Sequence, residues 1–156
     1  MAPLDQERRE AMYKKILIPT DGSPLSASAI TQGVALAKAM GATVMGMTVS
    51  VPFHTFALDP MMVSDTKETY KKHCEEQAAK YLGVIKTAAS AAGVPCEVAD
   101  VAAEHPYEAI IDTAKTAGCD AIVMASHGRR GASALVLGSE TVKVLTYSKI
   151  PVLVCR

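Results

Sequence analysis

The chain has no tryptophan, only two phenylalanines and no excess charge of either sign. Its sixteen basic and sixteen acidic residues cancel, whereas a dedicated nucleic-acid surface needs an excess of positive charge, so we expect no nucleic-acid partner. Apolar residues still make up 49% of the 156 positions, with alanine and valine dominant. This length and composition predict one domain whose core is built from aliphatic side chains.

Metal-binding motifs, membrane spans and secretory signals are also missing. The four cysteines have neither CxxC spacing nor neighbouring histidines, which predicts reduced thiols and no metal held by the protein itself. No run of about 18 apolar residues exists to span a membrane, and residues 1–12 are charged where a signal peptide would be apolar. We therefore expect a cytoplasmic protein with an N-terminal extension at 1–12 and one domain at 13–156.

Short apolar runs alternate with helical patterns along the chain. The runs predict strands at residues 15–19, 43–49, 96–101, 121–125 and 150–155, and the patterns predict helices at 24–40, 65–92, 106–117 and 139–147. Residues 51–64 have no clear period and are predicted to be a mobile loop. This order indicates an α/β fold, a single Rossmann-like doubly wound domain with helices on both faces of a parallel sheet.

Ligands of such sheets bind outside the carboxyl ends of the strands, here in the loops after the first and fourth strands. The second of these loops holds residues 126–128, followed by Gly138 and Ser139 at the start of a helix, where free N–H groups favour an anion. The lysine of the common phosphate loop is missing, so backbone groups and hydroxyls would carry most of the phosphate contact. Arg129 and Arg130 would add charge if the loop folds inward. Spacing alone leaves open that the glycines are only turn residues and Ser139 only an N-cap.

The chain resembles the universal stress protein family over residues 13–156. The resemblance rests on the opening at residues 15–21, the segment 120–128, the pair Gly138-Ser139 and the closing segment 150–154. It implies a five-stranded parallel sheet of order 3-2-1-4-5 and a homodimer through the C-terminal strand at residues 150–155. That strand is apolar, and an apolar sheet edge is a liability unless another strand pairs with it.

The ATP-binding branch of this family has the pattern G-2x-G-9x-G-[ST]. Here Ala125 replaces the first glycine, and nine residues separate Gly128 from Gly138-Ser139. By resemblance, Asp21 would hold the ribose, and Pro19 and Thr20 would line sugar and base. The Val49 backbone would contact adenine, and Met124 would pack near the nucleotide. The phosphates would contact Gly128, Gly138, Ser139 and the Glu140 amide. The candidate nucleotide-binding residues are Pro19, Thr20, Asp21, Val49, Met124, Ala125, Ser126, His127, Gly128, Arg129, Gly138, Ser139 and Glu140.

Several of these residues have a second interpretation. Asp21 is either a ribose ligand or a salt-bridged turn residue. The Glu140 side chain must point away from bound phosphate, since a carboxylate beside it repels it. His127 either bonds phosphate or stabilises its own loop. We do not expect its adjacency to Ser126 to bring the hydroxyl to the ring, and no G-x-S-x-G elbow is present.

The sequence thus predicts an ATP-binding stress-response protein, with Mg²⁺ held mainly by the phosphates. With no assigned base or nucleophile, it is at most a weak ATPase. The alternative is a dimeric family member that does not bind nucleotide and acts through protein partners.

Overall fold

The structure is a computed structural model that describes residues 12–53, 63–129 and 136–156. Its nine elements alternate along the chain: β1 (Lys15–Pro19), α2 (Pro24–Met40), β2 (Thr43–Ser50), α3 (Val63–Ala92), β3 (Cys96–Ala102), α4 (Pro106–Thr116), β4 (Ala121–Ala125), α5 (Ser139–Tyr147) and β5 (Val152–Cys155).

The five strands form one parallel sheet in the order β3-β2-β1-β4-β5. This confirms the predicted doubly wound fold. The strand order runs outward from β1 to β3 and then resumes with β4 on the other side of β1, so β1 and β4 lie side by side at the switch point. The loops after these two strands are therefore neighbours, as ligand binding at a switch point requires.

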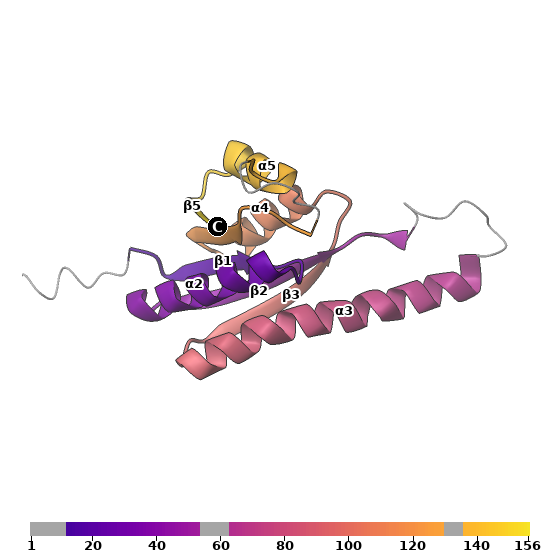
Figure 1. Cartoon of the computed structure of the whole chain (residues 1–156), viewed down its shortest axis with the longest axis horizontal. Helices are drawn as coiled ribbons and strands as arrows, with labels where there is room; N and C mark the ends of the chain where they lie inside the picture. The colour runs from indigo at the N-terminus through magenta and orange to yellow at the C-terminus, as the bar shows by residue number, and fades with distance from the viewer. Residues whose placement is uncertain (1–11, 54–62, 130–135) are drawn as a thin grey trace, which may run out of the picture.

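Two layers of aliphatic side chains cover the sheet. On one face Ile18 packs with Ile30 of α2 and Ile85 of α3, and on the other Leu17 packs with Ile110 of α4 and Val144 of α5. Figure 1 shows α4 and α5 on one side of the sheet and α3 on the opposite side. Neighbouring residues of β1 serve different layers because successive side chains of a strand point to opposite faces.

Most predicted boundaries agree with the structure to within one residue. The exceptions are β5, which begins at Val152 after Pro151, and α3, which begins at Val63 inside the segment predicted as a loop. The predicted N-terminal extension and the mobile loop fall largely on residues 1–11 and 54–62, which lie outside the described residues.

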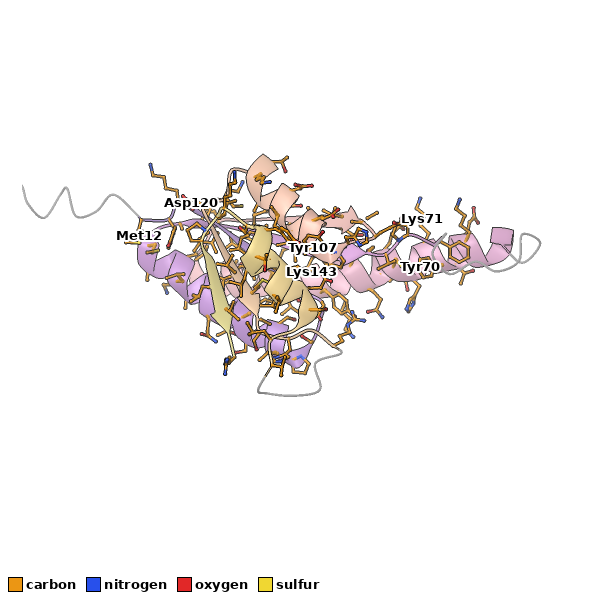
Figure 2. All side chains as sticks on the ribbon, turned by 90° about the horizontal axis from the view of Figure 1, so that it is seen from above. Met12, Tyr70, Lys71, Tyr107, Asp120 and Lys143 are labelled. Atoms are coloured by element: carbon orange, nitrogen blue, oxygen red, sulfur yellow. The ribbon has the colours of Figure 1, made fainter. Side chains whose placement is uncertain are left out.

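Asp120, just before β4, fixes the start of β1. Its two carboxylate oxygens accept hydrogen bonds from the backbone nitrogens of Lys14, at 2.8 Å, and Lys15, at 3.1 Å. Figure 2 shows Asp120 close to Met12, at the end of the molecule away from the projecting end of α3. This contact fixes the register of β1 against β4, and hence the position of the loop that follows β1.

The helix α3 has 30 residues, about 45 Å at the usual rise, and from residue 67 onward, where its side chains are described, those buried against the sheet lie in its second half. Its buried residues begin at Ala78, whereas Lys71 is exposed on the part that projects beyond the sheet (Figure 2). Tyr70 ties this part to the end of β2, since its hydroxyl donates to the Val51 carbonyl at 2.8 Å and its ring lies 5.2 Å from that of Phe53. None of the helices in the described ranges combines the length and apolarity that a membrane span requires.

Candidate nucleotide-binding site

The loops that follow β1 and β4 are in direct contact through Asp21. One carboxylate oxygen, Oδ1, accepts from the Ser23 nitrogen at 3.0 Å. The other, Oδ2, accepts from the Arg129 nitrogen at 2.8 Å. A Cβ added to Gly128 would lie 2.6 Å from that same Oδ2, so the loop approaches the carboxylate closely only because residue 128 is glycine.

The hydrogen bonds to Asp21 also decide its charge. Burial by itself would raise the pKa of this carboxyl, but hydrogen bonds from Ser23 and the Arg129 backbone favour the ionised form more strongly. The net result is a pKa below the ordinary value, and Asp21 is a carboxylate at neutral pH. It acts as the turn residue that joins the two loops, through bonds from the backbone nitrogens of Ser23 and Arg129.

Arg129 extends its side chain toward α3. Its Nε donates to the Asp21 carbonyl at 2.6 Å, and its guanidinium bonds the Tyr81 hydroxyl and lies 4.8 Å from the centre of the Tyr81 ring. The part of the loop that holds Arg130 and Gly131 lies outside the described residues. Sequence reasoning missed Tyr81 entirely, because no local pattern links a residue in the middle of a helix to a loop 48 positions away.

Ser126 and His127 form a clasp within the loop. The expectation that adjacency would keep the hydroxyl from the ring is wrong, since Ser126 Oγ lies 2.9 Å from His127 Nδ1. The other ring nitrogen, Nε2, bonds the Val136 carbonyl at the far end of the loop. Because a carbonyl only accepts, Nε2 carries the proton and Nδ1 accepts from Ser126. Ser126 is only 1% exposed, so the pair stabilises the loop and does not present a nucleophile.

Gly138 closes the loop from its other end. Its nitrogen donates to the Ser126 carbonyl at 2.8 Å, and a Cβ at this position would lie 3.2 Å from that oxygen and 3.3 Å from the His127 Cα. The Thr141 hydroxyl adds a bond to the Ala125 carbonyl at 3.0 Å. The loop thus leaves β4 and returns to the start of α5 within contact distance.

The N-terminus of α5 carries no side-chain cap. Its N-cap residue is Gly138, and Ser139, the first residue of the helix, is exposed. The carboxylate of Glu140 turns away toward α4, where its Oε2 accepts from the Tyr107 nitrogen at 2.8 Å, as the sequence analysis required of a phosphate site. The first N–H groups of α5 therefore have neither an intrahelical partner nor a side-chain acceptor from their own cap.

The remaining candidates lie around these loops. Pro19 ends β1, and Val49 lies near the end of β2. Thr20 is buried, and its hydroxyl lies 3.0 Å from Ser26 Oγ in the first turn of α2. Met124 is buried in the core layer beneath α4 and α5. Ala125 is the last residue of β4 and, like every other non-glycine residue of the described ranges, has no positive φ, so alanine is not strained where the family pattern has glycine.

The fold and this site together define a class: single-domain α/β proteins with a glycine-containing loop between β4 and the following helix at the switch point. Comparison with known proteins identifies the family within that class. The model of the universal stress protein family matches residues 12–156, and the chain belongs to this family.

Similar proteins are found among both sequences and structures. Universal stress protein MJ0531 of Methanocaldococcus jannaschii is 31% identical over 147 residues, covering 94% of this chain and 84% of its own. A universal stress protein of Thermus aquaticus is 32% identical, covering 93% of this chain and 100% of its own. The solved structure of MJ0577, also from Methanocaldococcus jannaschii, has a TM-score of 0.78 at 30% identity and covers 92% of this chain and 96% of its own.

Two more distant structures share the fold. A universal stress protein solved in complex with cAMP has a TM-score of 0.60 at 22% identity, covering 92% of this chain and 97% of its own. One from Archaeoglobus fulgidus in complex with dAMP has a TM-score of 0.57 at 18% identity, covering 93% of this chain and 99% of its own.

Proposed function

We propose that this protein binds an adenine nucleotide, ATP with Mg²⁺ on its phosphates, between the loop after β1 and the loop that joins β4 to α5. The observation that carries the proposal is the start of α5, where Gly138 supplies no cap and the Glu140 carboxylate is turned away onto the Tyr107 nitrogen. An anion is favoured at such a helix end. The cAMP and dAMP complexes of distant relatives are in keeping with an adenine ligand on this fold.

Each loop would supply a different part of the binding. The amides of Ser139 and Glu140, with the Ser139 hydroxyl, would contact phosphate oxygens, and Gly138 would let the phosphates come close to the backbone. The ionised Asp21 would accept from ribose hydroxyls, since a carboxylate has about four lone-pair sites. Pro19, Thr20 and the Val49 backbone would border sugar and base. Mg²⁺ would be bound mainly through the phosphates, since this ion often needs only one or two protein carboxylates.

The test is nucleotide content and ATP affinity, with Gly138→Val as the variant. A valine at 138 would meet the Ser126 carbonyl and His127 backbone, while Gly83→Val, at a position with nothing within 4 Å of an added Cβ, is the matched control. We expect saturable binding of Mg-ATP by wild type and Gly83→Val and loss of binding in Gly138→Val, with folding of each checked by circular dichroism. Ser139→Ala, a milder change at an exposed residue, should also weaken binding, and it provides the test if Gly138→Val does not fold.

Two results would contradict this proposal. If no adenine nucleotide co-purifies and wild type shows no saturable binding at millimolar Mg-ATP, the protein does not bind ATP. If Gly138→Val and Ser139→Ala both bind as wild type does, the site is elsewhere. Competition with ADP, AMP and cAMP in the same titration then identifies the preferred nucleotide.

The alternative function is that of a dimeric family member without nucleotide. The observation that favours it is that both Asp21 oxygens already accept from backbone nitrogens, those of Ser23 and Arg129. A closed pair of loops would then serve the fold alone. Absence of nucleotide binding in the titration above is the result this alternative requires.

In either case we propose a homodimer formed by pairing of β5 with its symmetry mate. Leu153 on this edge strand is 49% exposed, and Val142 and Leu145 on the adjoining helix α5 are 45% and 42% exposed. An isologous contact would cover these side chains and close the open edge. Light scattering tests it: Leu153→Asp should give monomers, whereas Val84→Asp, equally apolar and 47% exposed on α3, should leave the dimer intact. A monomeric wild type, or an intact Leu153→Asp dimer, refutes this interface.

A further inference from the structure

The opposite edge of the sheet, at β3, carries a groove that the nucleotide site does not use. Helix α4 packs over the inner strands, with Ile110 and Ile111 against Leu17 and Met47. The outer strand β3 is therefore left partly uncovered on this face. The space between β3 and α4 forms a groove of about 490 Å³.

The groove has an apolar floor and an acidic rim. Val101, Ala103 and Ala109 line it together with three exposed carboxylates, Glu104, Glu108 and Asp112; the remaining lining residues are Ala102, His105, Thr113 and Thr116. The rim therefore carries the negative charges of Glu108 and Asp112, and no lysine or arginine lines the groove beside them.

Glu108 lies in the first turn of α4, where the helix dipole favours an acidic residue, but contacts inside the molecule do not explain Asp112. Glu108 and Asp112 are four residues apart on α4, a spacing at which like charges repel and destabilise the helix. Glu108 accepts one bond, from the neighbouring Tyr107 hydroxyl at 2.7 Å. The Asp112 carboxylate makes no hydrogen bond or ion pair with any residue that the structure describes. A positively charged partner in the groove would attract both carboxylates and so offset the repulsion between them.

The strand beside the groove can supply backbone contacts as well. As the last strand of the sheet, β3 pairs only with β2, so half of its N–H and C=O groups point outward, away from the sheet. An extended peptide can bind such an edge as an added strand and place alternate side chains into a neighbouring groove. The edge and the groove thus favour the same ligand geometry.

We propose that this groove binds an extended, positively charged segment of another protein, which pairs with the β3 edge. Lysine or arginine stems would lie on Val101 and Ala103, with their charged ends at Glu108 and Asp112. A metal ion is not the occupant, since no cluster of three or more potential ligands in the described ranges could hold one. A second copy of this chain seated symmetrically on the groove is not the occupant either, because the lining holds no lysine or arginine that could meet the carboxylates of its mate.

The experiment uses a fluorescein-labelled peptide of seven residues, the length of β3, in which arginine alternates with valine. We expect saturable binding by fluorescence anisotropy to the full chain at low salt, and none for a peptide in which glutamate replaces arginine. Glu108→Gln combined with Asp112→Asn should weaken binding about tenfold, because two charge contacts are removed. The matched control is Glu75→Gln with Glu76→Gln, which removes two exposed carboxylates on α3. Circular dichroism confirms that both double variants fold.

Three results would overturn the proposal. One is no saturable binding of the arginine peptide. Another is equal weakening by the α3 control, which would show attraction to net charge alone. The third is binding that does not depend on the peptide backbone, seen as unchanged affinity when alternate peptide nitrogens are methylated or as displacement by equimolar spermidine. A ligand without backbone N–H groups cannot pair with β3. None of these results depends on nucleotide binding.

Discussion

The turn after β1 offers a sharp test of how α3 meets the site. Gly22 has φ +77°, and a Cβ there would lie 2.1 Å from a carbon of the Tyr81 ring. The left-handed conformation costs an alanine about 1–2 kcal/mol, and displacing a packed side chain costs about 1–3 kcal/mol more. We therefore expect Gly22→Ala to lower the free energy of unfolding by about 2–5 kcal/mol.

The control separates the two costs. Gly93 has φ +71° with nothing within 4 Å of an added Cβ, so Gly93→Ala should lose only the conformational part. In the background of Tyr81→Ala, Gly22→Ala should fall to the Gly93→Ala value, because the ring it collides with is gone. Urea unfolding followed by circular dichroism measures the free energies of unfolding of wild type, the three single variants and the double variant. Equal costs of Gly22→Ala and Gly93→Ala in wild type would show that Tyr81 does not lie over the turn.

Three further predictions concern single groups. The pKa of Asp21 lies below its ordinary 3.8, so its stabilising contribution is complete above that value and is lost as pH falls below it. The difference in free energy of unfolding between wild type and Asp21→Asn, measured in urea, should therefore shrink from pH 7 to pH 3, and a constant difference would contradict this. Glu140→Ala removes the acceptor of the Tyr107 nitrogen, and the N-cap residue of α4, His105, offers no side-chain bond in its place, so the free energy of unfolding should fall by about 1 kcal/mol and Tm by about 3 °C. Glu140→Gln should recover most of the loss, and equal melting temperatures of both variants would refute the capping role. Burial raises the pKa of the Cys119 thiol to about 11, so alkylation at pH 8 should reach it only on unfolding, later than half-buried Cys74, as peptide mass spectrometry would show; simultaneous labelling would contradict its burial.

Local patterns carried most of the fold. Apolar runs located the five strands. The ends of α2 also rest on local contacts, since the Ser23 hydroxyl accepts from the Ser26 nitrogen at 3.1 Å and Gly41 is the left-handed C-cap. These signals are legible because each acts within a few residues of its own position. The strand order came from the family resemblance, since hydrophobic periodicity says which segments are strands but not which strands are neighbours.

The contacts that hold the site together were less legible. Gly128 and Gly138 were matched to the family pattern, but the Asp21–Arg129 bond joins residues 108 positions apart and the Glu140–Tyr107 bond joins residues 33 apart. Such pairs involve side chains that are ordinary in their local segments. Their roles follow from the three-dimensional arrangement of β1, β4 and the helices, which one sequence does not encode as a local pattern.

The placement of Tyr81 and Ser139 bears on how a bound nucleotide would act on the rest of the molecule. Tyr81 belongs to the half of α3 that is packed on the sheet, next to buried Leu82, so its contact with Arg129 ties the loop after β4 to the core and not to the projecting half of the helix. Ser139, in contrast, starts the short helix whose next turn bears exposed Val142 and Leu145. A phosphate held at that helix start, as proposed, would act on a rigid element one turn from the proposed dimer surface. We therefore expect bound nucleotide to act mainly on the stability of the dimer, and less on the segment between β2 and α3.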